Sequence, residues 1–120
     1  MVAAWFADTK GRILFSQRTG EKLLGGLWEL PSLETSGKPM PRDAIHALRE
    51  QTGLLASDAK LHGKIGHTFS HFKLELHVYV VSGVSGALDK KRHPHARFAV
   101  AETLPLTTAT RRAIALPFRG

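Results

Sequence analysis

Five consecutive residues bring polar and aromatic side chains together between two apolar stretches: His67, Thr68, Phe69, Ser70 and His71. A serine hydroxyl both donates and accepts hydrogen bonds, and a phenylalanine ring can stack on a flat ligand. The spacing of His67 and His71 also suits zinc, but no third ligand is evident, so we expect no metal site. The alternatives are structural roles, with Phe69 in the core and Ser70 capping a turn.

A second group of candidate contact residues lies in the glycine- and lysine-rich segment that ends at Gly26. Gly25 and Gly26 lack a Cβ, which allows another molecule to approach the backbone closely. Arg18 and Lys22 flank these glycines with positive charge and suit phosphate groups. The basic run at residues 90–92 is a further candidate, although charge runs usually form solvated loops.

The overall charge favours a polyanionic partner. Seventeen Lys and Arg residues against ten Asp and Glu give a net charge of +7, and the sequence pI is near 10.3. This balance suits nucleic acid, although many small soluble proteins are also basic. The chain has no cysteine, which excludes disulfides, a thiol nucleophile and cysteine-held zinc or iron–sulfur clusters.

The length of 120 residues fits one domain over residues 1–120, and no repeat or linker divides it. The opening segment, MVAAWFADTKGR, lacks the basic and apolar regions of a signal peptide. No apolar run approaches the ~20 residues that span a bilayer. We therefore expect a cytoplasmic protein, associated with the nucleoid if it is bacterial.

Hydrophobic periodicity predicts the elements that position these residues. Apolar and polar residues alternate most clearly over residues 72–80, which indicates a half-buried strand. Apolar residues at helical spacing predict a helix from Pro41 to Thr52, followed by Gly53 at its end. Further strands are predicted at residues 2–7, 12–17, 27–30, 60–68 and 96–101, and a second helix at residues 107–116.

The order of these elements predicts an α+β protein. Three strands precede the first helix, and three more separate it from the second. We expect the first two strands to form a hairpin around the turn at residues 8–11. Because hairpins dominate and one helix lies in mid-chain, the pattern favours a mixed β-sheet with helices on its faces rather than a doubly wound fold.

The first helix and its exit resemble the end of a Nudix box, whose pattern is G-x5-E-x7-R-E-U-x-E-E-x-G-U. Gly53 and Leu54 set the register, and the other box positions then fall on Ser32, Lys38, His46, Ala47, Glu50 and Gln51. Nudix hydrolases cleave nucleoside diphosphate derivatives with Mg²⁺ held by carboxylates on one helix face. Only Glu50 remains of the three carboxylates that matter most. Asp43 lies about two turns earlier, outside the family position.

Two longer segments resemble the Nudix-like C-terminal domain of adenine DNA glycosylases of the MutY type. Residues 14–18 read LFSQR and residues 23–31 read LLGGLWELP, where the family has Q-R, a loop and G-L-W-E-F-P. Residues 67–74 read HTFSHFKL, close to the family's H-T-F-S-H followed by alternating apolar residues. The matches occur in the family's order, and the resemblance extends over nearly the whole chain.

This resemblance implies a Nudix-like α/β/α sandwich and a function in base excision repair. In the family, the loop that carries Phe69, Ser70 and His71 approaches 8-oxoguanine paired with adenine. The oxidised base has an N–H donor at N7 and a carbonyl at C8, and the Ser70 hydroxyl can bond to that edge. The resemblance further implies that Phe69 wedges or stacks against bases, and that His71 contacts phosphate or braces the loop.

In that family, base excision belongs to a separate helical domain that usually holds a cysteine-bound iron–sulfur cluster. This sequence contains neither. We therefore expect a cofactor-free DNA-binding domain that recognises 8-oxoguanine opposite adenine for a glycosylase domain, in cis or in trans, without excising a base itself. One alternative is a stand-alone Nudix hydrolase that uses Mg²⁺ and Glu50. Another is a protein-interaction domain on the same scaffold.

Overall fold

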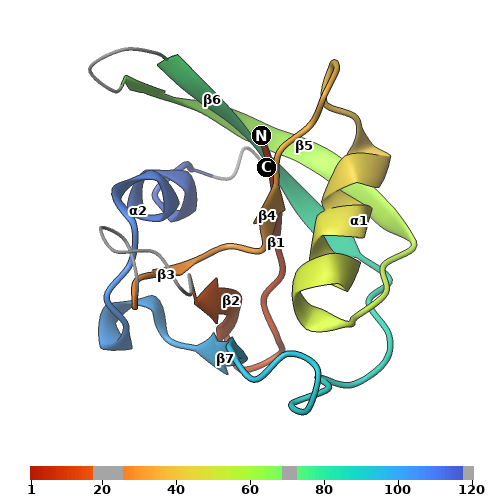
Figure 1. Cartoon of the computed structure of the whole chain (residues 1–120). Coiled ribbons are helices and arrows are strands. Elements are labelled where there is room, and N and C mark those ends of the chain that lie inside the picture. Colours follow the sequence, from red (N-terminus) through yellow and green to blue (C-terminus); the bar gives the residue numbers. More distant parts are fainter. Residues whose placement is uncertain (18–25, 69–72, 118–120) are drawn as a thin grey trace.

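A computed structural model describes residues 1–17, 26–68 and 73–117 of the chain (Figure 1). The described elements follow one another as β1 (Val2–Trp5), β2 (Ile13–Gln17), β3 (Trp28–Glu29), β4 (Ser32–Leu33), α1 (Pro41–Thr52), β5 (Asp58–Thr68), β6 (Lys73–Ser82), β7 (Ala96–Ala99), η1 (Ala101–Thr103) and α2 (Thr108–Ile114). The described helices are too short or too polar to cross a bilayer.

The strands form two sheets. The larger has the order β4-β1-β6-β5, and the smaller has the order β3-β2-β7. In the larger sheet β1 runs parallel to β6, whereas β4 pairs antiparallel with β1 and β5 antiparallel with β6. The predicted α+β class with a mixed sheet is therefore confirmed, and the second sheet is an addition to it.

The predicted hairpin around residues 8–11 is confirmed over a single bridge, but β1 and β2 do not pair with each other. Strand β1 is paired on both sides, by β4 and by β6, so it has no free edge for β2. In the described part of the chain, the two strands are joined by the antiparallel bridge between Ala7 and Ile13. Asp8 holds this turn by accepting hydrogen bonds from the backbone N–H of Lys10 at 2.9 Å and of Arg12 at 2.8 Å. The turn leads the chain from one sheet into the other.

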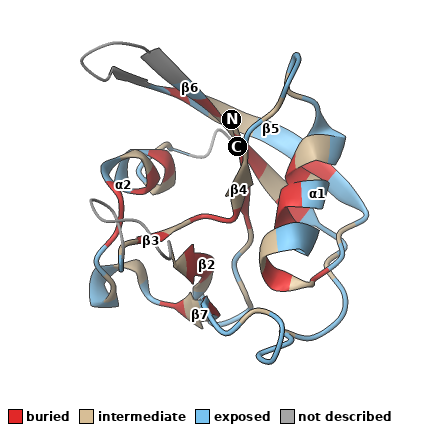
Figure 2. Ribbon diagram, in the orientation of Figure 1, coloured by how far each residue is buried: buried red, intermediate tan, exposed pale blue. Residues whose placement is uncertain are grey.

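Strand β1 lies at the centre because its residues alternate between two hydrophobic cores. Val2 and Ala4 belong to the core that includes residues of α1, whereas Ala3 and Trp5 belong to the core that includes Ala113 of α2. The two helices flank this strand, and both turn buried residues towards the sheets (Figures 1 and 2). The molecule is thus an α/β/α sandwich, as the sequence predicted.

Helix α1 has the predicted bounds because its start and end are encoded locally. Pro41 stands in the first turn, where its missing N–H costs nothing. Asp43 accepts a hydrogen bond from the backbone N–H of Met40 at 2.8 Å and caps the helix. Gly53 ends it in the left-handed conformation, with φ of 82°.

Strand β5 contains a bulge that exchanges its two faces. Leu61 pairs with Tyr79 but Gly63 pairs with Val78, so His62 is an extra residue in the ladder. Tyr79 belongs to the core beneath α1, and Val78 belongs to the core beneath α2. Residues after the bulge therefore present the opposite alternation from those before it.

Candidate nucleic-acid interface

The predicted contact residues lie mainly in two segments outside the described residues. Those in this position are Arg18, Lys22, Gly25, Phe69, Ser70 and His71. Gly26 is described, and the backbone of His67 and Thr68 is described within β5. The structure thus describes the residues that flank both segments, residues 18–25 and 69–72.

The first of these segments, residues 18–25, is flanked by Gln17 and Gly26, which are bonded to each other. Gln17 ends β2 and pairs with Trp28 of β3, and its Nε2 donates a hydrogen bond to the carbonyl of Gly26 at 3.0 Å. Gly26 has φ of 88°, a left-handed conformation that L-residues rarely adopt. A Cβ at this position would have no atom of the described residues within 4 Å, so none of these residues covers it.

The second segment joins the ends of a long antiparallel pair. After the bulge at His62, strands β5 and β6 stay in register up to the pairs His67 with Leu74 and Thr68 with Lys73. These ends project away from the body of the molecule, beyond α2 (Figure 1). Residues 69–72 therefore connect two strands whose direction is set by the sheet.

Helix α2 is bonded to β3 at its N-terminal end. Trp28 donates its backbone N–H to the carbonyl of Pro105 at 2.8 Å and accepts from the N–H of Thr107 at 3.0 Å. The N–H of Leu30 donates to Thr110 Oγ1 at 3.4 Å, and this hydroxyl is buried. The start of α2 is thereby fixed to the strand that follows the first segment.

The C-terminal end of α2 contacts β5. Arg112 Nη1 donates to the carbonyl of Gly66 at 2.5 Å, and the carbonyl of Leu116 accepts from His62 Nε2 at 3.1 Å. Leu116 also packs directly on the strand, since a Cβ at Gly63 would lie 2.8 Å from its Cδ1. One short helix is therefore bonded both to β3 and to the strand that leads into the second segment.

Trp28 is a core residue, as predicted, with 9% of its surface exposed. The exposed Arg97 of β7 lies over its ring, with Cζ 5.8 Å from the ring centroid, in a cation–π contact. Neither Arg97 nor Arg112 is among the contact residues predicted from the sequence. The alternation in the last predicted strand could have indicated that Arg97 is exposed, and the polar face of the last predicted helix could have indicated the same for Arg112.

The basic run at residues 90–92 belongs to a structured turn. Asp89 Oδ1 accepts from the backbone N–H of Lys91 at 3.1 Å and of Arg92 at 3.3 Å. Lys90 Nζ donates to the carbonyl of Ala96 at 2.5 Å. The turn lies at the opposite end of the molecule from the ends of β5 and β6 (Figure 1). It is therefore separate from the two predicted contact segments.

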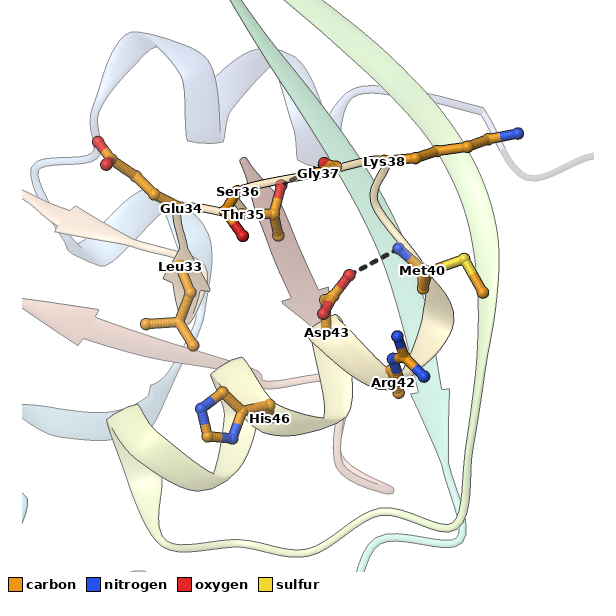
Figure 3. A pocket seen from close by; sticks show the side chains of 10 residues that line it. All are labelled: Leu33, Glu34, Thr35, Ser36, Gly37, Lys38, Met40, Arg42, Asp43 and His46. Atoms are coloured by element: carbon orange, nitrogen blue, oxygen red, sulfur yellow. Dashed lines mark hydrogen bonds between the residues drawn. The ribbon is translucent and has the colours of Figure 1, made fainter.

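The helix with the Nudix-box resemblance borders a polar groove of about 490 Å³ (Figure 3). Strand β4, the loop after it and the first turns of α1 form its walls. Lys38 stands where the box has a glutamate, and Arg42 and His46 add two more basic side chains. The Asp43 carboxylate points to the N–H of Met40 that it caps (Figure 3).

The described residues do not fit a Mg²⁺ site. Glu50 is exposed and is not among the residues that line the groove. Its Oε1 lies 3.9 Å from His46 Nε2, one helical turn away. Residues 1–17, 26–68 and 73–117 contain no group of three or more His, Asp or Glu side chains that could hold a metal ion. The carboxylates of this helix serve as a cap and a surface residue.

The arrangement of two helices around a mixed sheet, with a groove beside the first helix, agrees with the Nudix class of fold. The NUDIX domain family matches residues 2–116, so the chain belongs to this family. Within it, the chain is 40% identical over 70 residues to the adenine DNA glycosylase of Rattus norvegicus. The match covers 56% of this chain and 14% of that protein. The resemblance to adenine DNA glycosylases is therefore confirmed.

Solved structures share the fold. The C-terminal domain of mouse MUTYH, solved in complex with human PCNA, superposes with a TM-score of 0.72 at 24% identity, covering 96% of this chain and 83% of that one. A MutT NUDIX hydrolase from Burkholderia pseudomallei also gives 0.72, at 23% identity, covering 97% and 98%. Since the two superpose equally well, the fold alone does not separate a glycosylase domain from a hydrolase.

Proposed function

We propose that this domain recognises 8-oxoguanine opposite adenine in duplex DNA and directs a glycosylase domain to that adenine, without excising the base itself. The observation that carries the proposal is the 40% identity to an adenine DNA glycosylase over more than half of this chain. The net charge of +7 supports a nucleic-acid partner. The lack of a fitting Mg²⁺ site among the described residues weighs against the hydrolase alternative.

In this proposal, the two segments share the work of recognition. Ser70 bonds to the altered edge of 8-oxoguanine, Phe69 inserts or stacks against bases, and His71 contacts phosphate or braces its loop. In the first segment, Gly25 and Gly26 allow close approach of the DNA backbone, with Arg18 and Lys22 on the phosphates. The glycosylase domain acts in cis or in trans, in the cytoplasm or at a bacterial nucleoid.

The test compares binding to duplexes that carry 8-oxoguanine or guanine opposite adenine. We expect the wild type to prefer the oxidised duplex, and Ser70→Ala to reduce this preference by about 5- to 150-fold, the range for one base-specific contact. Ser36→Ala removes an exposed hydroxyl from the groove beside α1 and serves as the matched control. Equal affinity of the wild type for both duplexes would reject the proposal.

The hydrolase alternative has its own assay. Under the proposed function, the chain with Mg²⁺ releases no product from nucleoside diphosphate derivatives, because its described carboxylates do not converge on a metal site. Hydrolysis that requires Mg²⁺ and disappears in Glu50→Ala would establish the alternative instead. An unrelated Nudix hydrolase assayed in parallel verifies the substrates.

A further inference from the structure

Arg112 makes a contact that lies outside both hydrophobic cores. Its side chain is exposed, yet Nη1 donates to the backbone carbonyl of Gly66 at 2.5 Å. Strand β5 is an edge strand of the larger sheet, with β6 on its one paired side. Backbone groups on the outer edge of such a strand need other partners. Arg112 supplies one of these partners from a separate element.

The contact between Arg112 and Gly66 lies close to the end of β5. Gly66 lies two residues before Thr68, where the described part of β5 ends. Another hydrogen bond between the described C-terminal residues and β5, from His62 to Leu116, is four residues further back. The contact at Gly66 is therefore the one closer to residues 69–72.

The opposite end of α2 is fixed more firmly. Thr107 and Thr110 are buried and bond to Trp28 and Leu30. A helix of seven residues is about 10 Å long. It therefore connects β3, through the bonds of Thr107 and Thr110, to β5, through the bond of Arg112 to Gly66.

We propose that Arg112 is a positioning residue for base recognition: through Gly66 it holds the end of the β5–β6 pair in a fixed orientation relative to β3. The inference rests on the proposed function, in which the segments that adjoin these strands contact the DNA together. Loss of the contact removes none of the side chains that the proposed function assigns to base or phosphate contacts, but it frees the described end of β5 from α2. Discrimination between bases then falls more than overall affinity does.

The neighbouring arginine provides a matched control. Arg111 is also exposed on α2 and carries the same charge, but it lines the groove between η1 and α2 rather than bonding to β5. Removal of either arginine takes one positive charge from the same helix. If the role of Arg112 is purely electrostatic, the two variants should lose the preference for 8-oxoguanine to the same extent. If Arg112 positions the strand, only the Arg112 variant should lose it.

The experiment uses the full chain with Arg112→Ala, Arg112→Lys and Arg111→Ala. Affinities are measured for duplexes with 8-oxoguanine or guanine opposite adenine, and backbone amide NMR shifts are recorded without DNA. We expect Arg112→Ala alone to reduce the preference for 8-oxoguanine by about 3- to 10-fold, the range for one hydrogen bond, and to shift amides of residues 64–68. Arg112→Lys retains a donor and restores part of the preference.

Two results overturn the proposal separately from the proposed function. If the wild type discriminates but Arg112→Ala discriminates equally well, Arg112 does not position the strand. If Arg111→Ala loses the preference to the same extent, the effect is one of charge. If the wild type itself shows no preference, the proposed function fails, and the role of Arg112 in recognition fails with it.

Discussion

At the scale of single residues, the surviving parts of the Nudix box have structural reasons to be there. Gly53 ends α1 with φ of 82°, and Leu54 is buried with 3% of its surface exposed. Neither residue depends on a metal or a substrate. The register of the box could therefore be read from the sequence even though only Glu50 remains of its three main carboxylates.

Replacing Gly53 with alanine should destabilise the fold by about 1–2 kcal/mol, because an L-residue is strained in the left-handed conformation. A Cβ there would also lie 3.3 Å from His93 Cδ2, closer than an ordinary contact. Chemical denaturation of both proteins measures the difference. Gly37→Ala, at an exposed glycine with nothing within 4 Å of the added Cβ, is the control and should be nearly neutral.

Tyr79 is the only tyrosine of the chain, so its ionisation can be followed by ultraviolet absorbance. Burial raises its pKa above the ordinary value of 10.0, and the negative charge of Asp43 raises that pKa further. In a titration with base, we expect the tyrosinate absorbance to appear at a higher pH in the folded protein than in the unfolded chain. Asp43→Asn should lower the pKa while keeping an oxygen that can accept from the helix cap.

The same shift predicts how stability depends on pH. The folded protein holds the Tyr79 proton more tightly than the unfolded chain does. The contribution of Tyr79 to the free energy of unfolding is therefore fully present below pH 10.0. It is lost as the pH rises through the folded pKa. Tyr79→Phe removes the titrating group, and its stability should therefore fall less steeply over that alkaline range. A parallel decline of both proteins would contradict the assignment.

At the scale of elements, local signals were sufficient where the chain encodes its own boundaries. Pro41 and Gly53 bracket α1, and its predicted limits are confirmed. The hairpin of the first two strands is limited to one bridge, because the pairing of β1 depends on partners far along the chain, such as β6. Strands β3 and β4 have two residues each, too few for a periodic pattern, and β4 was missed for that reason.

Thr107 links the second helix to the smaller sheet and is open to a direct test. Its Oγ1 accepts from the backbone N–H of Thr110 at 3.2 Å, which caps the helix. Thr107→Ala should cost about 1 kcal/mol, typical of a lost N-cap. The exposed neighbour Thr108 gives the control, because Thr108→Ala leaves the cap intact. Denaturation midpoints of the two variants should differ, and equal midpoints would count against the cap.

At the scale of the whole molecule, the fold and the proposed chemistry are separate questions. The same superposition quality is reached by a glycosylase domain and by a hydrolase. The sequence could predict the fold, because periodicity and the two family-like segments extend along most of the chain. The recognition residues Phe69, Ser70 and His71 stay predictions, since they lie outside the described residues.

The net charge of +7 predicts a steep salt dependence of DNA binding. Each phosphate contact adds about 0.9 to the magnitude of the slope of log affinity against log salt concentration, so two or three contacts give about −2 to −3. Fluorescence anisotropy with a labelled duplex measures this slope. A flat dependence would instead favour a protein-interaction domain whose basic surface is incidental.

The bulge at His62 constrains how this chain can change in length during evolution. Removal of His62 would make the pairs of Leu61 with Tyr79 and of Gly63 with Val78 adjacent, which restores a regular ladder and leaves Ile65 opposite Leu76 in the core beneath α2. Removal of Lys64 with the earlier pairs kept would instead place Ile65 opposite His77, on the other side of the sheet. Relatives that keep this core can therefore lose the bulge residue, but they should not carry a single-residue deletion elsewhere within β5.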